Sequence, residues 1–318
     1  MIKIGIIEEI HQDGIDLLKN NKNFSYEVIT DTSDENLKKK LPEFDAISLR
    51  VKKISNDIYA LAKKLKVISR HGVGYDNVDT QFLKQNNLVL LITATANALT
   101  VAEHVMYMML SIAKGNFKHH LETQKGNFNK NAKKIQTIEL YKKKMLIAGF
   151  GRIGKNLIKR CLGFDMEVNV FDPFINANEI KKYGGTKVED FNQALEENDF
   201  ISLHMPLNDK TRNLVNYQNL KTMKKNAIIV NTARGGIINE KELDKALNEN
   251  LIFGAGLDVF EQEPTDPNNP LLKNEKVLLT PHVAALTEEC KSRMAKETIQ
   301  NIIDFFENKL DKSKQIKL

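Results

Sequence analysis

One segment predicts much of the architecture of this chain: Gly149-Phe150-Gly151-Arg152-Ile153-Gly154. An apolar run, Met145–Ala148, precedes it, and an amphipathic stretch, Lys155–Arg160, follows it. A strand, a glycine turn and a helix in this order are typical of the phosphate-binding turn of a dinucleotide-binding sheet. Gly149 permits the tight turn, Gly151 leaves room for a pyrophosphate, and Gly154 lets the helix pack closely on the strand. The alternative is a structural glycine turn that binds nothing.

The acid that follows the turn predicts the cofactor. Asp172 closes the next apolar run, and Pro173 and Phe174 come after it rather than arginines. A carboxylate here accepts hydrogen bonds from the ribose hydroxyls and repels a 2′-phosphate, which favours NAD over NADP. The phosphates are expected at the unpaired amides of the helix N-terminus. The cofactor-binding residues expected in this part of the chain are Gly149, Gly151, Arg152, Ile153, Gly154 and Asp172.

Apolar runs alternate with amphipathic segments on both sides of the turn, which indicates parallel sheets covered by helices. Strands are expected at 2–7, 26–30, 45–50, 66–69, 88–93, 145–148, 167–171, 200–203, 227–231, 255–259 and 277–279. A buried helix is expected over 100–113, an exposed Lys-rich arm or loop over 114–144, and an amphipathic helix over 288–308. The predicted fold is α/β with two doubly wound parallel-sheet domains. A Rossmann NAD-binding domain (98–285) is inserted in a flavodoxin-like substrate-binding domain (1–97 plus 286–318).

Composition narrows the class of protein. Among 318 residues, Lys and Arg number 47 and Asp and Glu 41, a net charge of +6. The basic residues are scattered among acids, so a solvated surface is favoured over a nucleic-acid or lipid patch. Two cysteines form neither a disulfide framework nor a zinc pattern, and no metal site is expected. The first apolar run is too short for a signal peptide and no membrane span is expected, so the expected location is the cytoplasm.

Four chemically active side chains stand just past predicted strands: Arg234, Asp258, Glu263 and His282. In a doubly wound sheet, ligands bind outside the carboxyl ends of the strands. We therefore expect these four side chains around one crevice, beside the nicotinamide end of a bound dinucleotide. Taken singly, each has a plainer interpretation: a strand-end histidine, a surface arginine in a glycine turn, or an acid that flanks a proline. His104, His119, His120 and His204 are expected to be structural or surface residues.

The chain resembles the D-isomer-specific 2-hydroxyacid dehydrogenases, a family that includes phosphoglycerate, glycerate and D-lactate dehydrogenases. The resemblance covers nearly the full length. It rests on the glycine turn, Ala233-Arg234-Gly235-Gly236, Asp258-Val259-Phe260 with Glu263-Pro264, and Thr280-Pro281-His282, which occur in order and at the family's spacing. The position of the turn in mid-chain argues against the L-lactate and malate dehydrogenases. The resemblance implies an NAD-dependent oxidoreductase acting on a CH–OH group.

The resemblance also implies a role for each matching residue. His282 is implied to be the general acid/base, Glu263 to hold its ring and favour the imidazolium, and Arg234 to clamp the substrate carboxylate and polarise the keto oxygen. Asp258 is implied to accept from the nicotinamide carboxamide, while Glu263 stands where formate dehydrogenases of this fold have glutamine. The backbone amides of Gly72, Val73 and Gly74 are implied to bind the carboxylate from the other domain. Further residues expected to border the cofactor are Pro206, Thr211, Thr232 and Ala233.

The identity of the substrate is the open part of the prediction. Arg50 ends a predicted strand before Val51, Lys52 and Lys53, and an arginine at the matching place holds the phosphate in phosphoglycerate dehydrogenases. A cation there suits a second anionic group on a small 2-hydroxy or 2-keto acid, whereas a solvated basic loop is the alternative. The regulatory C-terminal domain of many phosphoglycerate dehydrogenases is expected to be absent.

Three functions therefore stay open. The first is an NAD-dependent D-2-hydroxyacid dehydrogenase, the second a 3-phosphoglycerate dehydrogenase of serine synthesis, and the third an NAD-sensing, corepressor-like binding protein without turnover. The resemblance implies a homodimer with residues 100–144 at the interface. Two chain crossings, near Asn97 and Ala285, imply a hinge whose closure would exclude water from the cleft.

Overall fold

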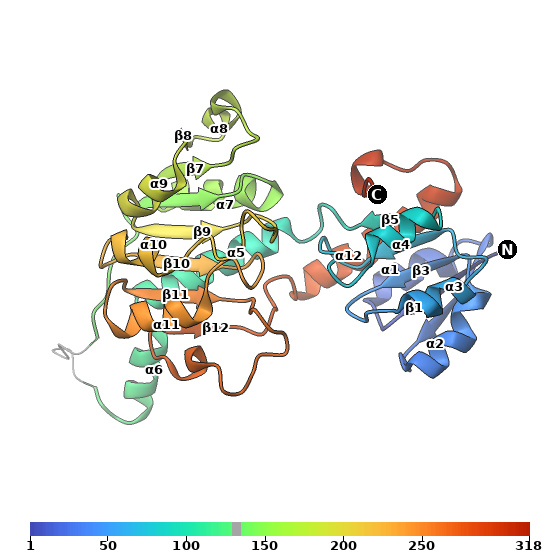
Figure 1. The fold of residues 1–318 in the computed structure, drawn as a ribbon, viewed down its shortest axis with the longest axis horizontal. Coiled ribbons are helices and arrows are strands. Elements are labelled where there is room, and N and C mark those ends of the chain that lie inside the picture. Colours follow the sequence, from blue (N-terminus) through green and yellow to red (C-terminus); the bar gives the residue numbers. More distant parts are fainter. Residues whose placement is uncertain (129–134) are drawn as a thin grey trace. The chain divides into compact units, whose positions relative to one another are not determined.

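The chain folds into two α/β units, each built on its own parallel sheet (Figure 1). The structure is a computed structural model that describes residues 1–128 and 135–318. Unit 1 contains Met1–Asn97 and Leu286–Leu318, and unit 2 contains Ala98–Ala285. Both ends of the chain therefore belong to unit 1.

Unit 1 is built on a five-stranded parallel sheet of order β2-β1-β3-β4-β5. This is the strand order of flavodoxin-like sheets, so the predicted fold class is confirmed for this unit. Its strands are β1 (Ile2–Ile7), β2 (Phe24–Ile29), β3 (Ala46–Leu49), β4 (Val67–Arg70) and β5 (Val89–Ile92).

Helices cover both faces of this sheet (Figure 1). They are α1 (Gln12–Lys19), α2 (Asp34–Lys40), α3 (Asn56–Leu61), α4 (Thr80–Gln85) and α12 (Glu288–Phe306), with 3-10 turns at Leu41–Glu43 and Lys312–Lys314. The C-terminal helix α12 buries Ile299, Ile302 and Ile303 on one face of the sheet and packs on α1. A Cβ on Gly14 of α1 would lie 2.8 Å from the backbone of Ala295, so glycine is what lets the two helices approach.

Unit 2 is built on a seven-stranded parallel sheet of order β12-β11-β10-β9-β6-β7-β8. Its strands are β6 (Lys144–Ala148), β7 (Glu167–Phe171), β8 (Thr186–Val188), β9 (Phe200–Leu203), β10 (Ile228–Asn231), β11 (Gly254–Leu257) and β12 (Val277–Leu279). The order reverses between β7 and β9 around β6, as in dinucleotide-binding sheets with one added edge strand. The predicted Rossmann architecture is therefore confirmed, and its crevice lies at the carboxyl ends of β6 and β9.

The helices of unit 2 also lie on both faces of the sheet (Figure 1). They are α5 (Ala98–Ala113), α6 (Asn116–Gln124), α7 (Arg152–Gly163), α8 (Ala177–Lys182), α9 (Phe191–Glu197), α10 (Tyr217–Thr222) and α11 (Glu240–Asn248), with a 3-10 turn at Pro270–Lys273. The expected buried helix is α5, which packs on α7. Neighbouring residues of β6 point to opposite cores, since Met145 and Ile147 face α5 and α7 whereas Leu146 and Ala148 face the other side.

The Lys-rich segment 114–144, expected to be an exposed arm or loop, contains a helix that was not predicted. Helix α6 occupies part of it, yet α6 buries none of its residues. Without an apolar stripe, the hydrophobic spacing could not predict a helix there. Residues 129–134 of the expected interface region lie outside the described residues.

The longest helix in the described part of the chain is α12, with 19 residues, of which seven are charged. None of the described helices has the length and hydrophobicity that crossing a bilayer requires.

Candidate functional site at the carboxyl edge of the unit 2 sheet

The glycine turn joins β6 to α7 in a conformation that only glycine allows. Gly149 has φ +100°, and a Cβ at this position would lie 2.7 Å from the carbonyl oxygen of His204. A Cβ on Gly154 would lie 2.5 Å from the carbonyl oxygen of Gly149. The turn is thus packed between the ends of β6 and β9, at the switch point of the sheet.

The turn also leaves an open space beside Gly151 at the start of α7, here called the phosphate cradle. A Cβ on Gly151 would meet no atom within 4 Å. Gly151 is the N-cap of this 12-residue helix, and no side chain caps the helix amides. Unpaired amides and the positive end of the helix dipole attract anions. The residues present therefore fit a pyrophosphate at the place that the sequence predicts, with Arg152 and Ile153 as the first residues of the helix.

Asp172 is fixed at this turn by its own hydrogen bonds. The amide of Phe150 donates to Asp172 Oδ2 (2.7 Å), and the amide of Phe174 donates to Oδ1 (2.9 Å). The structure thus places the predicted ribose acceptor beside the predicted phosphate cradle. A carboxylate accepts up to about four hydrogen bonds, so two hydroxyls can still be accommodated.

The other predicted cofactor residues lie past β9 and β10. The Thr211 hydroxyl donates to the Pro206 carbonyl (2.7 Å) and closes the loop after β9. Thr232 is buried, and its hydroxyl has no hydrogen-bond partner among the described residues. A buried unpaired hydroxyl is uncommon in a folded protein, so it fits a position that a ligand completes. Ala233, the next residue, is tied through its amide to Asn231 Oδ1 (3.0 Å).

His282 and Glu263 form a hydrogen-bonded pair past the ends of β12 and β11. His282 Nδ1 lies 2.8 Å from Glu263 Oε2, and Glu263 Oε1 accepts from the amide of Phe260 (3.1 Å). An ionised carboxylate only accepts hydrogen bonds, so Nδ1 carries the proton. The side chain of His282 is 53% exposed, and its Nε2 is therefore the nitrogen available to a substrate.

The pair shifts both pKa values in opposite directions. The hydrogen bond to Glu263 is the largest effect on His282 and raises its pKa. Burial and the Arg234 charge act to lower this pKa, whereas the Asp258 charge acts to raise it. Burial acts to raise the pKa of Glu263, but the bonds from His282 and the Phe260 amide, with the charges of His282 and Arg234, lower it overall. The pair therefore holds a proton on His282 above the usual pH for an imidazole.

Arg234 lies close enough to affect both members of this pair electrostatically. Its Nη1 donates to the Ala233 carbonyl (2.6 Å), which orients the half-buried side chain. The next residue, Gly235, touches the loop that carries Glu263, because a Cβ there would lie 1.8 Å from the Phe260 carbonyl oxygen. The structure thus brings Arg234, Glu263 and His282 together, as the sequence predicts for the crevice.

Asp258 lies behind His282 and is fully buried. Its carboxylate accepts hydrogen bonds from the amides of Val283 (2.8 Å) and Ala284 (3.0 Å) and from the Thr280 hydroxyl (2.6 Å). These bonds organise the His282 loop. The Asp258 carboxylate is also predicted to accept a hydrogen bond from the nicotinamide carboxamide. That bond, still a prediction, would be additional to these three.

A reciprocal pair of hydrogen bonds between Glu240 and Glu261, which the sequence does not predict, fixes the Glu263 loop. Glu240 accepts from the amide of Glu261 (2.5 Å), and Glu261 accepts from the amide of Glu240 (3.0 Å). Asn269 also donates to Glu240 (2.5 Å). Burial raises the pKa of Glu240, with the nearby Glu261 and Glu263 charges adding to it. Two glutamates 21 residues apart form no local sequence pattern that would predict their contact. The sequence indicates only that a helix begins at Glu240, after an asparagine N-cap.

The predicted substrate residues Arg50 and Gly72–Gly74 belong to unit 1. Arg50 Nη1 donates to the Glu9 carbonyl (2.9 Å). Arg70 shapes the glycine loop by donating to the Gly74 carbonyl (2.8 Å). Within residues 1–128 and 135–318, the structure gives no acceptor to the amides of Gly72, Val73 or Gly74. They can therefore serve an external carboxylate.

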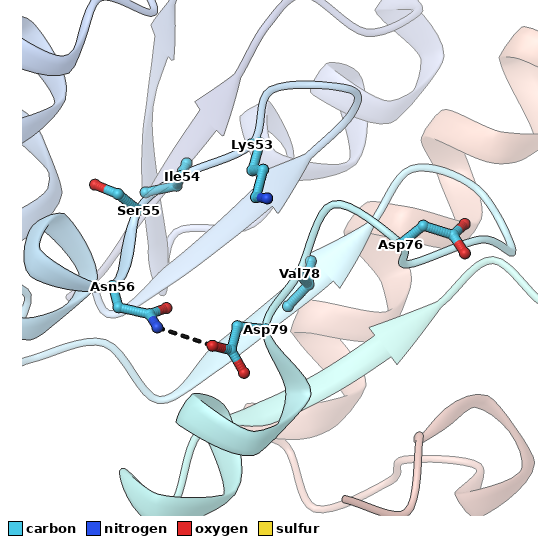
Figure 2. Close-up of a pocket in the computed structure, with 7 residues that line it drawn as sticks. All are labelled: Lys53, Ile54, Ser55, Asn56, Asp76, Val78 and Asp79. Atoms are coloured by element: carbon cyan, nitrogen blue, oxygen red, sulfur yellow. Dashed lines mark hydrogen bonds between the residues drawn. The ribbon is translucent and has the colours of Figure 1, made fainter. Parts of the chain in front are cut away.

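A cavity of about 380 Å³ lies beside these loops in unit 1 (Figure 2). Its charged lining consists of Lys53, Asp76 and Asp79, and Asn56 Nδ2 donates to Asp79 Oδ2 (2.8 Å). Neither Arg50 nor Gly72–Gly74 lines it, so the predicted substrate residues are not assembled around this cavity. No group of three or more His, Cys, Asp or Glu side chains in the described ranges is placed to hold a metal ion.

Known proteins similar to this chain indicate its family. Residues 106–284 match the family described as D-isomer specific 2-hydroxyacid dehydrogenase, NAD binding domain. The chain is 38% identical over 292 residues to D-3-phosphoglycerate dehydrogenase of Methanocaldococcus jannaschii, covering 92% of this chain and 55% of that protein. It is 35% identical over 303 residues to hydroxypyruvate reductase of Thermotoga maritima, covering 94% and 97%.

A solved structure gives the same result for the fold. D-lactate dehydrogenase from Aquifex aeolicus, complexed with NAD and lactic acid, superposes with a TM-score of 0.85 at 26% identity over 98% of each chain. The chain spans about half the length of the D-3-phosphoglycerate dehydrogenases that it matches.

Proposed function

Because the chain belongs to the D-isomer-specific 2-hydroxyacid dehydrogenase family, we propose that it catalyses NAD-dependent interconversion of a small 2-hydroxy acid and its 2-keto acid. One observation carries the proposal: the His282–Glu263 pair, with atoms 2.8 Å apart, within electrostatic reach of Arg234. An acid/base beside a carboxylate and a guanidinium is the set that proton transfer at a substrate hydroxyl requires.

The roles follow from the proton positions. When bound, NAD supplies or accepts the hydride at C2 of the substrate. In reduction, protonated His282 donates to the keto oxygen while Glu263 stabilises the imidazolium. In oxidation, neutral His282 accepts the hydroxyl proton at Nε2. Arg234 binds the substrate carboxylate and stabilises negative charge on the oxygen. Positioned acid/base assistance of this kind contributes about 10²–10⁴-fold to the rate.

The family is an NAD-binding one, and we assign the cofactor to particular residues of unit 2. The Gly151 cradle would hold the pyrophosphate, Asp172 the ribose hydroxyls, and the unpaired Thr232 hydroxyl would meet a polar cofactor atom. Asp172 favours NAD over NADP because a carboxylate repels the added phosphate.

The decisive experiment follows NADH consumption by its absorbance with a panel of 2-keto acids: glyoxylate, hydroxypyruvate, pyruvate and 3-phosphohydroxypyruvate. We expect turnover with at least one of them. Tight NADH binding without turnover on the whole panel would instead favour an NAD-sensing binding protein and reject the proposed activity.

The substrate candidate with the most support is 3-phosphohydroxypyruvate. Support comes from the name of the archaeal relative and from Arg50, whose guanidinium keeps further donors after its bond to the Glu9 carbonyl. Lys52 is a weaker candidate because it pairs with Asp34 (2.8 Å). An Arg50→Gln variant should raise KM for the phosphorylated keto acid and leave KM for pyruvate unchanged. Equal effects on both substrates would assign Arg50 to the fold alone.

A further inference from the structure

Hydrogen bonds to Asp258, and one to the Thr280 carbonyl oxygen (3.0 Å), hold the backbone of His282 in an unusual conformation. His282 has φ +54°, in the left-handed region that a residue with a Cβ seldom adopts. The amides of three consecutive residues donate to Asp258: His282 to its carbonyl oxygen (2.8 Å), Val283 to Oδ1 (2.8 Å) and Ala284 to Oδ2 (3.0 Å). Strained backbone persists only where its surroundings over-determine it. Asp258 supplies most of that restraint.

Asp258 is in turn fixed by Thr280. The carboxylate is fully buried, so each of its oxygens needs donors. The Thr280 hydroxyl donates to Oδ1 at 2.6 Å, a short charge-assisted bond. Thr280 follows β12, and Asp258 follows β11, so this bond ties together the ends of two neighbouring strands.

His104 of α5 continues the chain of bonds. Its Nε2 lies 3.0 Å from the Thr280 hydroxyl oxygen and 3.7 Å from Asp258 Oδ1. A threonine hydroxyl has one proton, and Thr280 gives it to Asp258; hence His104 must be the donor, with its proton on Nε2. Burial lowers the pKa of His104, opposed by the Asp258 charge, which favours the neutral ring. Each hydrogen bond of the chain therefore has one direction: His104 donates to Thr280, and Thr280 donates to Asp258.

We propose that His104 and Thr280 are positioning residues that act through Asp258 to hold His282 in its reactive orientation. The inference rests on the proposed function, since it takes His282 to be the acid/base. His104 of α5 and the ends of β11 and β12 are joined in one set of hydrogen bonds, and Asp258 connects this set to the backbone of His282. Neither side chain is needed to touch the substrate or the cofactor. Hydrogen bonds in such a chain strengthen one another, so removal of His104 or Thr280 weakens the bonds that remain.

The test uses the full chain and paired variants. Thr280→Val removes the hydroxyl at nearly constant volume, and Thr280→Ser restores it. We expect Thr280→Val to lower kcat about 10- to 100-fold, because small misplacements of a reacting group cost this much. KM should change less than kcat, and Thr280→Ser should recover most of the rate. His104→Leu should lower kcat in the same direction.

Two controls separate positioning from folding. Thr298→Val removes a buried hydroxyl of α12, which donates to the Met294 carbonyl (2.7 Å), and should reduce stability without reducing kcat. In a double-mutant cycle, His104→Leu should add little to Thr280→Val, because both break one chain. Full additivity, or an equal loss of kcat in Thr298→Val, would overturn the proposal.

A readout without turnover keeps this inference separate from the proposed function. His282 can be titrated by NMR in ¹³C-histidine-labelled protein, with His282→Ala assigning its signal. We expect Thr280→Val to lower the pKa of His282 towards about 6.5, its ordinary value, as the bond to Glu263 loosens. An unchanged His282 titration would overturn the positioning role. Absence of turnover in the unmodified protein would instead reject only the proposed activity.

Discussion

At the scale of single residues, the chemistry depends on one proton held at His282. His282→Ala should lower kcat for keto-acid reduction about 10²–10⁴-fold, the usual contribution of a positioned acid/base. NADH affinity, measured by fluorescence titration, should stay unchanged because the imidazole of His282 is assigned to the substrate and not to the cofactor. His120→Ala on the exposed face of α6 is the matched control. Near-normal turnover in His282→Ala would remove His282 from the mechanism.

Glu263 sets the pH range in which that proton is available. Its hydrogen bond raises the pKa of His282, against the Arg234 charge and with help from Asp258. Reduction needs the protonated ring, so the rate of reduction falls as pH rises through this raised pKa. Oxidation needs the neutral ring, so the rate of oxidation rises over the same pH range. Glu263→Gln should move the falling limb of the reduction profile to lower pH, towards about 6.5. A profile of kcat against pH that does not move would show that Glu263 does not set the pKa.

At the scale of elements, two glycines of similar appearance in the sequence should behave differently. A Cβ on Gly235 would meet the Phe260 carbonyl at 1.8 Å, whereas a Cβ on Gly151 meets nothing within 4 Å. Gly235→Ala should therefore lower the free energy of unfolding by about 1–3 kcal/mol, the range for overpacking. Gly151→Ala should cost less, about 0.5–1 kcal/mol, because alanine is a poorer N-cap than glycine but meets no neighbouring atom here. It should instead weaken NADH binding by filling the cradle. Urea denaturation and NADH titration check the two effects, and equal stabilities would contradict the packing argument.

The elements most visible in the sequence are those with continuous apolar runs. The bounds predicted for β7, β9 and β12 agree with the structure residue for residue. Helix α2 was not predicted, because it buries only Leu37 and depends on its Ser33 cap. Strand β8 was also not predicted, because it is a short, half-exposed edge strand. Short elements without a buried face leave no periodic pattern to detect.

The same limit applies to the site. Arg234, Glu263 and His282 could be predicted because each follows a strand in a parallel sheet, which brings strand ends to one edge. The Glu240–Glu261 hydrogen bonds and the His104–Thr280 bond could not be predicted. His104 and Thr280 are 176 residues apart, and only the packing of α5 on the sheet brings them together.

At the scale of the whole molecule, each unit has its own hydrophobic cores, so changes in one need not unfold the other. The C-terminal helix α12 packs on α1, near the start of the chain. Unit 1 is therefore complete only after residues 286–318 have been made.

The homodimer, proposed on the family resemblance, provides the last test. Helix α6 buries no residue and exposes Phe117 by 65%, and a helix without a buried face gains little from its own chain. A partner subunit covering α6 would supply that missing burial. Phe117→Asp should shift the protein from dimer towards monomer in sedimentation velocity. Phe174→Asp, a change at a 92% exposed position outside 100–144, should not. A dimer unaffected by Phe117→Asp would place the interface elsewhere, and a monomeric unmodified protein would reject the homodimer itself.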